Sequence, residues 1–274
     1  MTDNVRDFYR RNADRESTRF QTPLQRIEFA STLRLIDTYF PKTGHVCDIG
    51  SGPGRYALEL ARRGYAVSLI DLTDALLDRA RSAFEDSGLS AVTFEVADAR
   101  DLSMLRTASF EAALLLGPMY HITDFSGRQR ALAEMRRILA PGGNAIVAYL
   151  NTWGLIRTGI ADFPDWYRNR DTIFSLLNPR GYSAEELRGF TEAYWATPPQ
   201  ALHEVTTAGF EVISYAGAEG FCGGMLPTLA TLDERDPDAY ENIVAVAAET
   251  CELPQYRDAT DHLHLVIRRL PDGL

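Results

Sequence analysis

The stretch Val46–Arg55, V-C-D-I-G-S-G-P-G-R, decides how this chain folds. Its apolar first residues indicate a short buried strand, and Gly50, Gly52 and Gly54 predict a turn without room for side chains. The residues that follow, Tyr56–Arg63, have a helical pattern. A strand, a glycine turn and a helix in this order predict a βαβ unit, with a ligand crevice at the carboxyl ends of its strands.

The second strand of this unit, Ala66–Asp71, ends in a carboxylate. Asp71 lies about where a carboxylate accepts hydrogen bonds from both ribose hydroxyls of a nucleoside. A dinucleotide such as NAD fits poorly, because Gly54 comes one residue too early for G-x-G-x-x-G and Pro53 has no N–H to offer a pyrophosphate. Asp48, just before the turn, favours a ligand with a cationic group, such as a sulfonium or an α-amino group.

The run D-I-G-S-G-P-G-R at residues 48–55, together with Asp71, resembles the first two motifs of class I S-adenosylmethionine (SAM)-dependent methyltransferases. The likeness covers most of residues 43–150. It implies SAM as the cofactor and an α/β, Rossmann-like fold. In that fold a mostly parallel seven-stranded sheet carries helices on both faces, and here an inserted helical cap is expected in addition.

The resemblance also implies where the cofactor binds. Asp98 follows a predicted third strand, Val92–Val96, at the position that contacts the adenine amino group in the family; the alternative is an ordinary turn or capping aspartate. We expect the cofactor to contact residues of the strand ends and turns: Asp48, Gly50, Ser51, Gly52, Gly54, Asp71, Leu72, Asp98, Ala99, Leu116 and Gly117.

A fourth strand, Phe110–Leu116, is too continuously apolar for an exposed edge and belongs inside a parallel sheet. The sequence G-P-M-Y-H follows it, and loops at the carboxyl ends of parallel strands carry ligands and chemistry. His121 is the best-placed general base, since histidine titrates near neutral pH; the alternative is a hydrogen-bonded loop histidine. Tyr120 is expected to wall the methyl site, so His121 and Tyr120 are the predicted catalytic residues.

The loop at residues 117–121 lacks two sequence features, and their absence limits the classes of methyl acceptor. The loop lacks the D/N-P-P-Y sequence of methyltransferases that act on amino groups of bases or on protein amides. It also lacks the acidic metal ligands of catechol-type enzymes. We therefore expect no metal, and neither a nucleic-acid nor a protein acceptor.

The stretches on either side of the core have less specific patterns. Residues 1–42 are predicted to be helical, with Pro23 breaking or starting a helix. By resemblance they form a lid, and Tyr9 and Arg19 are candidates to face the methionine end of SAM, although no motif fixes either position. The alternative for the first helical stretch is a solvated amphipathic helix.

Residues 151–199 break the α/β rhythm and are predicted to be an inserted cap, because loops this long are usually functional or disordered. The cap's aromatic side chains suit either a substrate pocket or simple core packing. These aromatic residues are Trp153, Phe163, Trp166, Tyr167, Phe174, Tyr182, Tyr194 and Trp195. Residues 43–150 then form the SAM-binding core, and residues 200–274 complete it with two late antiparallel strands, Glu211–Tyr215 and His262–Leu270.

The net charge, the cysteines and the lack of long apolar runs indicate which kinds of binding partner this chain has. A net charge of -10 argues against nucleic acid, which requires a basic face. The three cysteines lack metal-ligand spacing and suggest reduced thiols, and neither a signal peptide nor a membrane-spanning apolar run is evident. We expect a cytoplasmic protein without membrane contact, and a homodimer is possible.

The sequence thus predicts an enzyme that transfers the methyl group of SAM to an O, N or C nucleophile of a small molecule. One alternative is SAM-consuming chemistry of another kind, such as intramolecular cyclisation or aminopropyl transfer, which releases methylthioadenosine. Another is a non-catalytic SAM-binding accessory protein. Such a protein usually has a degraded glycine turn or lacks one of the acids, and this chain shows neither departure.

Overall fold

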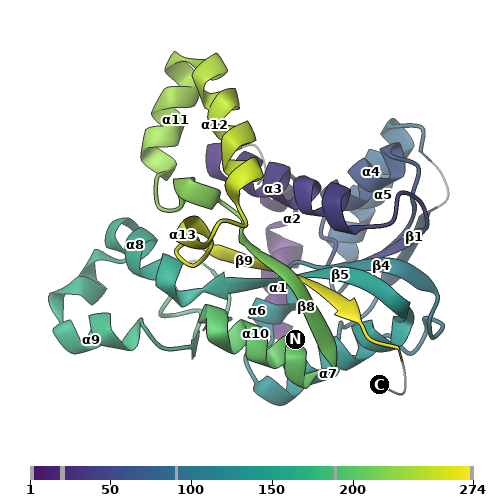
Figure 1. Ribbon diagram of the computed structural model, residues 1–274. Coiled ribbons are helices and arrows are strands. Elements are labelled where there is room, and N and C mark those ends of the chain that lie inside the picture. The colour runs from purple at the N-terminus through teal and green to yellow at the C-terminus, as the bar shows by residue number, and fades with distance from the viewer. Residues whose placement is uncertain (1–2, 19–21, 90–91, 188–189, 272–274) are drawn as a thin grey trace.

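A twisted, mostly parallel sheet forms the centre of the computed structural model, which describes residues 3–18, 22–89, 92–187 and 190–271 (Figure 1). Five strands pair in parallel in the order β3-β2-β1-β4-β5. Their bounds are His45–Ile49 for β1, Ala66–Asp71 for β2, Val92–Val96 for β3, Phe110–Leu115 for β4 and Leu139–Asn151 for β5. This confirms the predicted Rossmann-like sheet.

Two late strands close the sheet beyond β5, as the sequence predicts. Strand β9 (His262–Arg269) pairs antiparallel with β5, and β8 (Phe210–Gly217) pairs antiparallel with β9. Because β9 runs against its neighbour, its first residue, His262, lies opposite Leu150 near the carboxyl end of β5. The start of β9 therefore lies at the same edge of the sheet as the ends of the parallel strands.

The inserted segment adds two strands to the seven that were predicted. Strands β6 (Arg180–Tyr182) and β7 (Ala193–Ala196) form a hairpin, and β7 pairs in parallel with the last two residues of β5. Leu150 pairs with β7 on one side and with β9 on the other. The pairing of β4 with β5 ends at Val147, so β7 of the hairpin pairs with the same edge of β5 further along the strand. The sheet consequently has nine strands.

Helices cover both faces of the sheet, because alternate residues of each buried strand point to opposite sides. The helices of the first face are α3 (Pro23–Tyr39), α4 (Arg55–Arg62) and α5 (Asp74–Asp86), and those of the second face are α6 (Pro118–His121), α7 (Phe125–Ile138) and α10 (Pro198–Thr207). In β1, Val46 packs against the helices of the first face, and Cys47 packs against those of the second face. Figure 1 shows the two layers above and below the sheet.

The N-terminal helices run from the carboxyl edge of the sheet onto its first face. The predicted break at Pro23 is confirmed, since this residue begins α3. Before it come α1 (Asp3–Arg11) and α2 (Ala13–Thr18), which pack on α5 through two ion pairs. Arg10 binds Asp74 at 3.1 Å, and Arg79 of α5 binds Asp14. These contacts hold α1 across the carboxyl edge of β2.

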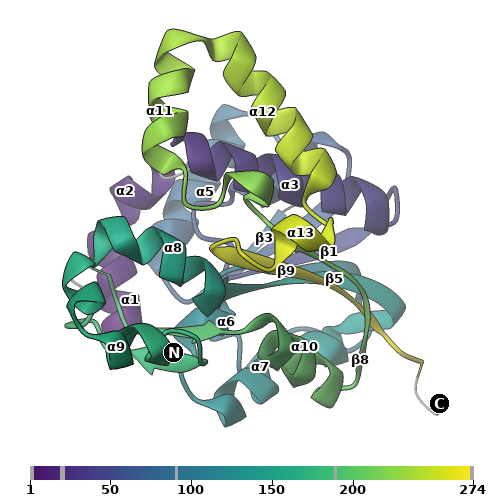
Figure 2. The same cartoon turned by 60° about the vertical axis from the view of Figure 1, so that its left-hand side comes forward.

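Two helical groups project from the core (Figures 1 and 2). One is the inserted segment, in which α8 (Thr152–Asp162), the 3₁₀ helix η2 (Pro164–Arg168) and α9 (Arg170–Ser175) precede the β6–β7 hairpin, so the expected helical cap also contains strands. The other joins β8 to β9 and contains η3 (Gly220–Cys222), α11 (Leu226–Arg235), α12 (Pro237–Thr250) and α13 (Pro254–Arg257). Within the described ranges, no helix has both the length and the apolar character needed to cross a membrane.

A buried ion pair joins the two long helices of the second face. Arg128 of α7 donates through Nη2 to Glu204 Oε1 at 2.7 Å and through Nε to Oε2 at 2.8 Å. The side chains are 3% and 0% exposed. Tyr149 also donates its hydroxyl hydrogen to Glu204 Oε2. Removing one charge would therefore leave the other buried in the core without its counter-ion.

We expect Arg128→Ala to lower the free energy of unfolding by about 3–5 kcal/mol, because an uncompensated buried carboxylate remains. Replacing both partners, as in Arg128→Met with Glu204→Met, should recover most of this loss. Urea unfolding of the two variants and the wild type provides the measurement. A single variant as stable as the wild type would show that the pair contributes little.

Candidate active site

A pocket of about 840 Å³, its open mouth included, lies at the carboxyl ends of β1, β2 and β4. The structure brings most of the predicted site residues together there. Those that line it are Tyr9, Asp48, Gly50, Ser51, Gly52, Asp71, Leu72, Leu116, Gly117, Tyr120 and His121. Segments from α1, the glycine turn, the end of β2 and α6 thus meet around one cavity.

The glycine turn is shaped by close approach of other backbone segments. Gly50 has φ +74°, and a Cβ on it would lie 2.5 Å from Cδ of Pro118 at the start of α6. Gly52 has φ +56°, yet a Cβ there would meet nothing within 4 Å. A side chain at Gly52 would therefore be strained and would take up ligand space. Gly54 does not line the pocket; it precedes α4 and lets that helix pack against Leu69.

Asp71 ties this turn to the strand beside it. Its Oδ2 accepts the backbone N–H of Gly52 at 2.8 Å, and its Oδ1 accepts that of Thr73 at 2.8 Å. Burial raises the pKa of Asp71 to about 6, although both N–H groups favour the ionised form. The carboxylate has lone pairs left for a sugar hydroxyl, so its predicted contact with ribose agrees with its position.

The carboxylate of Asp48 has one buried oxygen without a hydrogen-bond partner among the described residues. Asp48 is 2% exposed, and that oxygen is its Oδ2. Burial, followed by the nearby charge of Asp71, raises its pKa to about 7. A buried carboxylate oxygen without a partner is costly, and a cationic ligand would compensate it. The residues present therefore fit a nucleoside that carries a positive charge, such as SAM.

Besides Gly54, two of the predicted cofactor residues, Asp98 and Ala99, do not line the pocket. Asp98 binds its neighbour Arg100, with 2.7 Å between Oδ2 and Nη2, and does not line the cavity. Ala99 is buried beside it at 2% exposure. Arg19 lies outside the described residues. The adenine contact of Asp98 stays a prediction, and it requires the pair with Arg100 to open or to share the carboxylate.

His121 has hydrogen-bond partners on both ring nitrogens. Its Nε2 lies 2.7 Å from the hydroxyl of Tyr9, and its Nδ1 lies 3.2 Å from the carbonyl oxygen of Glu192. Since a carbonyl only accepts, Nδ1 carries the hydrogen of the neutral ring and Nε2 accepts from Tyr9. Tyr9, a lid candidate, is thus fastened over the pocket by the residue that was predicted to be the base.

Several lining residues were not predicted from the sequence, among them Glu28, Arg55 and Thr73. Thr73 follows Asp71 directly, so the motif itself could have indicated it. Glu28 reaches the pocket from the middle of α3, more than forty positions before the end of β2. No local pattern distinguishes it from other helical glutamates.

Comparisons with known proteins identify relatives in sequence and in fold. Residues 46–143 match the family described as "Methyltransferase domain". A ubiquinone biosynthesis O-methyltransferase of Thiobacillus denitrificans is 32% identical over 175 residues, which cover 58% of this chain and 73% of the relative. A tRNA 5-carboxymethoxyuridine methyltransferase of Escherichia coli is 22% identical over 237 residues, covering 86% of this chain and 84% of the relative.

Among solved structures, one similar fold is that of Burkholderia thailandensis 1,6-didemethyltoxoflavin-N1-methyltransferase with its substrate and S-adenosylhomocysteine (SAH) bound. Its TM-score is 0.61 and its sequence identity 15%, with 98% of this chain and 88% of that chain covered. At this identity the likeness concerns the fold.

We expect the affinity for SAM to rise with pH up to about 7, because a cationic ligand favours ionised Asp48, whose pKa is about 7. Each pH unit below that value should cost up to about tenfold in affinity. Calorimetric titrations between pH 5.5 and 8.5 would measure this, with Asp48→Asn as the variant in which the slope should flatten. An equal slope in both proteins would exclude Asp48 as its source.

The same raised pKa values predict how stability changes with pH. The usual pKa of Asp is about 3.9, so a buried Asp with a higher value stabilises the fold at low pH. For Asp48 and Asp71 that stability should decline as the pH rises from about 4, the usual pKa of Asp, to about 6 to 7, and it should be absent above their raised pKa values. Thermal unfolding of the ligand-free protein across this range should show the decline. Saturating SAM should reduce it.

Asp71→Ala should weaken SAM binding by about 1.5–3 kcal/mol while the protein still folds, since charge-assisted hydrogen bonds to the turn and to ribose are lost. Asp78→Ala, which removes an exposed acid from α5, is the matched control. Titration calorimetry and circular dichroism would measure binding and folding. Unchanged affinity in a folded Asp71 variant would show that this acid serves only the local loop.

Proposed function

The chain belongs to the class I SAM-dependent methyltransferases, and we propose that its acceptor is a small molecule with an oxygen, nitrogen or carbon nucleophile. SAM supplies an electrophilic methyl group on a sulfonium centre. What the protein must add is alignment of the nucleophile with that methyl carbon, which is worth about 7–11 kcal/mol in well-oriented models. A base is required only when the nucleophile must lose a proton.

In this proposal each pocket residue binds a different part of the cofactor. Asp71 accepts from the ribose hydroxyls, Asp48 compensates a cationic group, and the backbone of Gly50–Gly52 lies against the ligand. The support is the position of these residues around one cavity and the buried oxygen of Asp48 that lacks a described partner. Tyr120, also in the lining, would wall the methyl site on the acceptor side.

The observation that carries the small-molecule proposal is the apolar cluster between Tyr120 and the inserted segment. It lies beyond the carboxyl ends of β4 and β5, next to a lining residue of the pocket. Its buried members are Tyr120, Leu150, Leu155, Leu176, Tyr182, Leu187, Ala193 and Trp195. The ring of Trp166 stacks on that of Tyr182 at 5.5 Å. These side chains pack against one another beside the pocket, and their apolar and aromatic surface would suit a compact, partly aromatic acceptor.

Tyr182 adds a polar feature to this cluster. Its hydroxyl oxygen is buried and has no hydrogen-bond partner among the described residues, and burial raises its pKa to about 12. A buried hydroxyl of this kind is usually satisfied by a protein group, water or a ligand. We propose that it meets a polar atom of the acceptor.

A tRNA acceptor is the second candidate, because a relative that matches most of this chain is a tRNA methyltransferase. The net charge of -10 and the missing D/N-P-P-Y sequence weigh against it. A homodimer, a cytoplasmic location and the domain boundaries at residues 42, 150 and 199 stay predictions.

The decisive experiment is an acceptor screen in which both products are detected by mass. Purified protein and SAM are incubated with phenols, amines and carboxylic acids, and separately with bulk tRNA. SAH together with a methylated small molecule would support the proposal. Methylated tRNA would replace it with the second candidate. Methylthioadenosine would point to cyclisation or aminopropyl transfer.

If His121 is the general base, His121→Ala should leave SAM binding nearly intact and slow methyl transfer by about 10²–10⁴-fold. The rising limb of the pH–rate profile should also vanish. Tyr9→Phe is the informative partner variant, since it removes the hydroxyl bound to Nε2. An equal loss in both variants, with the pH limb kept, would mean that His121 acts by holding Tyr9 over the pocket.

A further inference from the structure

A second histidine lies at the catalytic edge of the sheet, far from His121 in sequence. His262 begins β9 and pairs with Leu150 at the end of β5. Beside it, the backbone N–H of Asn151 donates to the carbonyl of Asp261 at 2.8 Å. The side chain of His262 is 15% exposed. Topology therefore places this ring where the acceptor and the methyl group are expected to meet.

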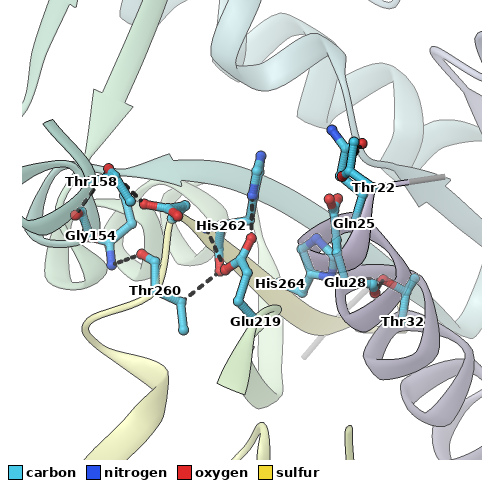
Figure 3. A network of polar contacts seen from close by, with 12 residues as sticks. Thr22, Gln25, Glu28, Thr32, Gly154, Thr158, Glu219, Thr260, His262 and His264 are labelled. Atoms are coloured by element: carbon cyan, nitrogen blue, oxygen red, sulfur yellow. Dashed lines mark hydrogen bonds and ion pairs between the residues drawn. The ribbon is translucent and has the colours of Figure 1, made fainter. Parts of the chain in front are cut away.

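Glu219 fixes the orientation of that ring. Its Oε1 lies 2.6 Å from His262 Nδ1, and its Oε2 accepts the backbone N–H of His262 at 3.2 Å. The carboxylate itself is 1% exposed. Because a carboxylate accepts, Nδ1 carries the hydrogen, and the basic lone pair of the neutral ring is on Nε2. In Figure 3 this second nitrogen is at the end of the ring that points away from Glu219.

The pair borders the pocket through two lining residues. The rings of His262 and Tyr120 have centroids 6.4 Å apart, and Tyr120 lines the pocket. Glu28, another lining residue, has a carboxylate oxygen within 4.8 Å of ligand atoms of both Glu219 and His262. The ring of His262 therefore lies beside Tyr120, a residue that belongs both to the pocket lining and to the apolar cluster of the inserted segment.

We propose that His262 and Glu219 form the proton-accepting pair of this enzyme and that its acceptor is a protic nucleophile, a hydroxyl or an N–H group. The proposal rests on the proposed function. As the acceptor's lone pair bonds to the methyl carbon, the carbon–sulfur bond breaks and sulfur keeps its electron pair. The proton of the acceptor goes to His262 Nε2. Glu219 is a positioning residue that holds the ring and offsets the charge of the imidazolium.

Several charged and titratable groups lie near the ring, and Arg157 of α8 acts on Asp261 beside them. These groups come from α3, α6, the loop before η3 and the start of β9: Glu28, Tyr120, Glu219, Asp261 and His264. Burial, and then the charge of Glu219, raises the pKa of Asp261 to about 7. Burial lowers the pKa of His264 to about 4, so that ring stays neutral. His264 therefore does not compete for the proton.

In this proposal the two histidines have different roles. The Nε2 of His121 accepts the hydroxyl hydrogen of Tyr9, so a proton reaches it only if Tyr9 moves or relays it. His121 then closes the lid through Tyr9, and His262 serves the acceptor side.

The first test needs no turnover. In ¹⁵N-histidine-labelled protein with SAH, NMR should show the neutral His262 ring with its hydrogen on Nδ1. Glu219→Gln should lower the pKa of that ring by about one to three pH units, since it keeps the shape and removes the charge. The His262→Gln spectrum assigns the resonance. A hydrogen on Nε2, or a pKa unaffected by Glu219→Gln, would overturn the pair.

The second test uses phenol and 4-nitrophenol as paired acceptors at pH 8, with SAH and the methyl ether as readouts. His262→Gln should slow methylation of phenol by about 10²–10⁴-fold and that of the already ionised nitrophenol by less than about tenfold. His203→Gln, which removes an exposed histidine from α10, is the matched control and should behave as wild type. Equal losses for both acceptors, or none, would refute the role of His262.

The outcomes separate this proposal from the proposed function. Methyl ether formed at the wild-type rate by His262→Gln would refute the pair and leave the methyltransferase function intact. If wild type methylates neither phenol, the NMR titration alone decides whether the pair exists. Activity lost on dialysis against EDTA and restored by Mn²⁺ would instead assign Glu28, Glu219 and His262 to a metal, and would overturn proton transfer to the ring.

Discussion

The hydrogen bonds of the Asp71 carboxylate are the constraint on which the site depends. One oxygen holds the N–H of Gly52 in the glycine turn, and the other holds the N–H of Thr73, just before α5. The end of β2 thereby fixes the turn after β1 and the start of the next helix at once. A carboxylate that is 7% exposed tolerates this position because backbone donors satisfy it.

The same edge of the sheet concentrates charge that the fold alone does not neutralise. Asp48 is buried close to Asp71, whose charge raises the cost of ionising Asp48. A ligand with a positive centre relieves this repulsion, so its binding offsets part of the free-energy cost of burying the two acids. The preference for a sulfonium cofactor over a dinucleotide then follows from charge as well as from the position of the glycines.

The acceptor side is assembled from parts that are remote in the chain. Tyr120 comes from α6 after β4, the apolar cluster from the inserted segment, and His262 from the start of β9. They meet because parallel strands end at one edge and an antiparallel strand begins there. If the acceptor binds where we propose, changes in the insertion would alter the choice of acceptor without altering the cofactor turn and its two acids.

The sequence by itself determined the sheet, the cofactor turn and Asp71, because strand periodicity, glycine spacing and strand-end acids are local patterns. It also indicated the late antiparallel strands. Only the tertiary structure decided that the insertion adds a hairpin to the sheet, that Tyr9 fastens onto His121, and that Glu219 holds His262. These pairings join residues between about 10 and more than 100 positions apart, and no local pattern encodes a contact made only when distant elements pack.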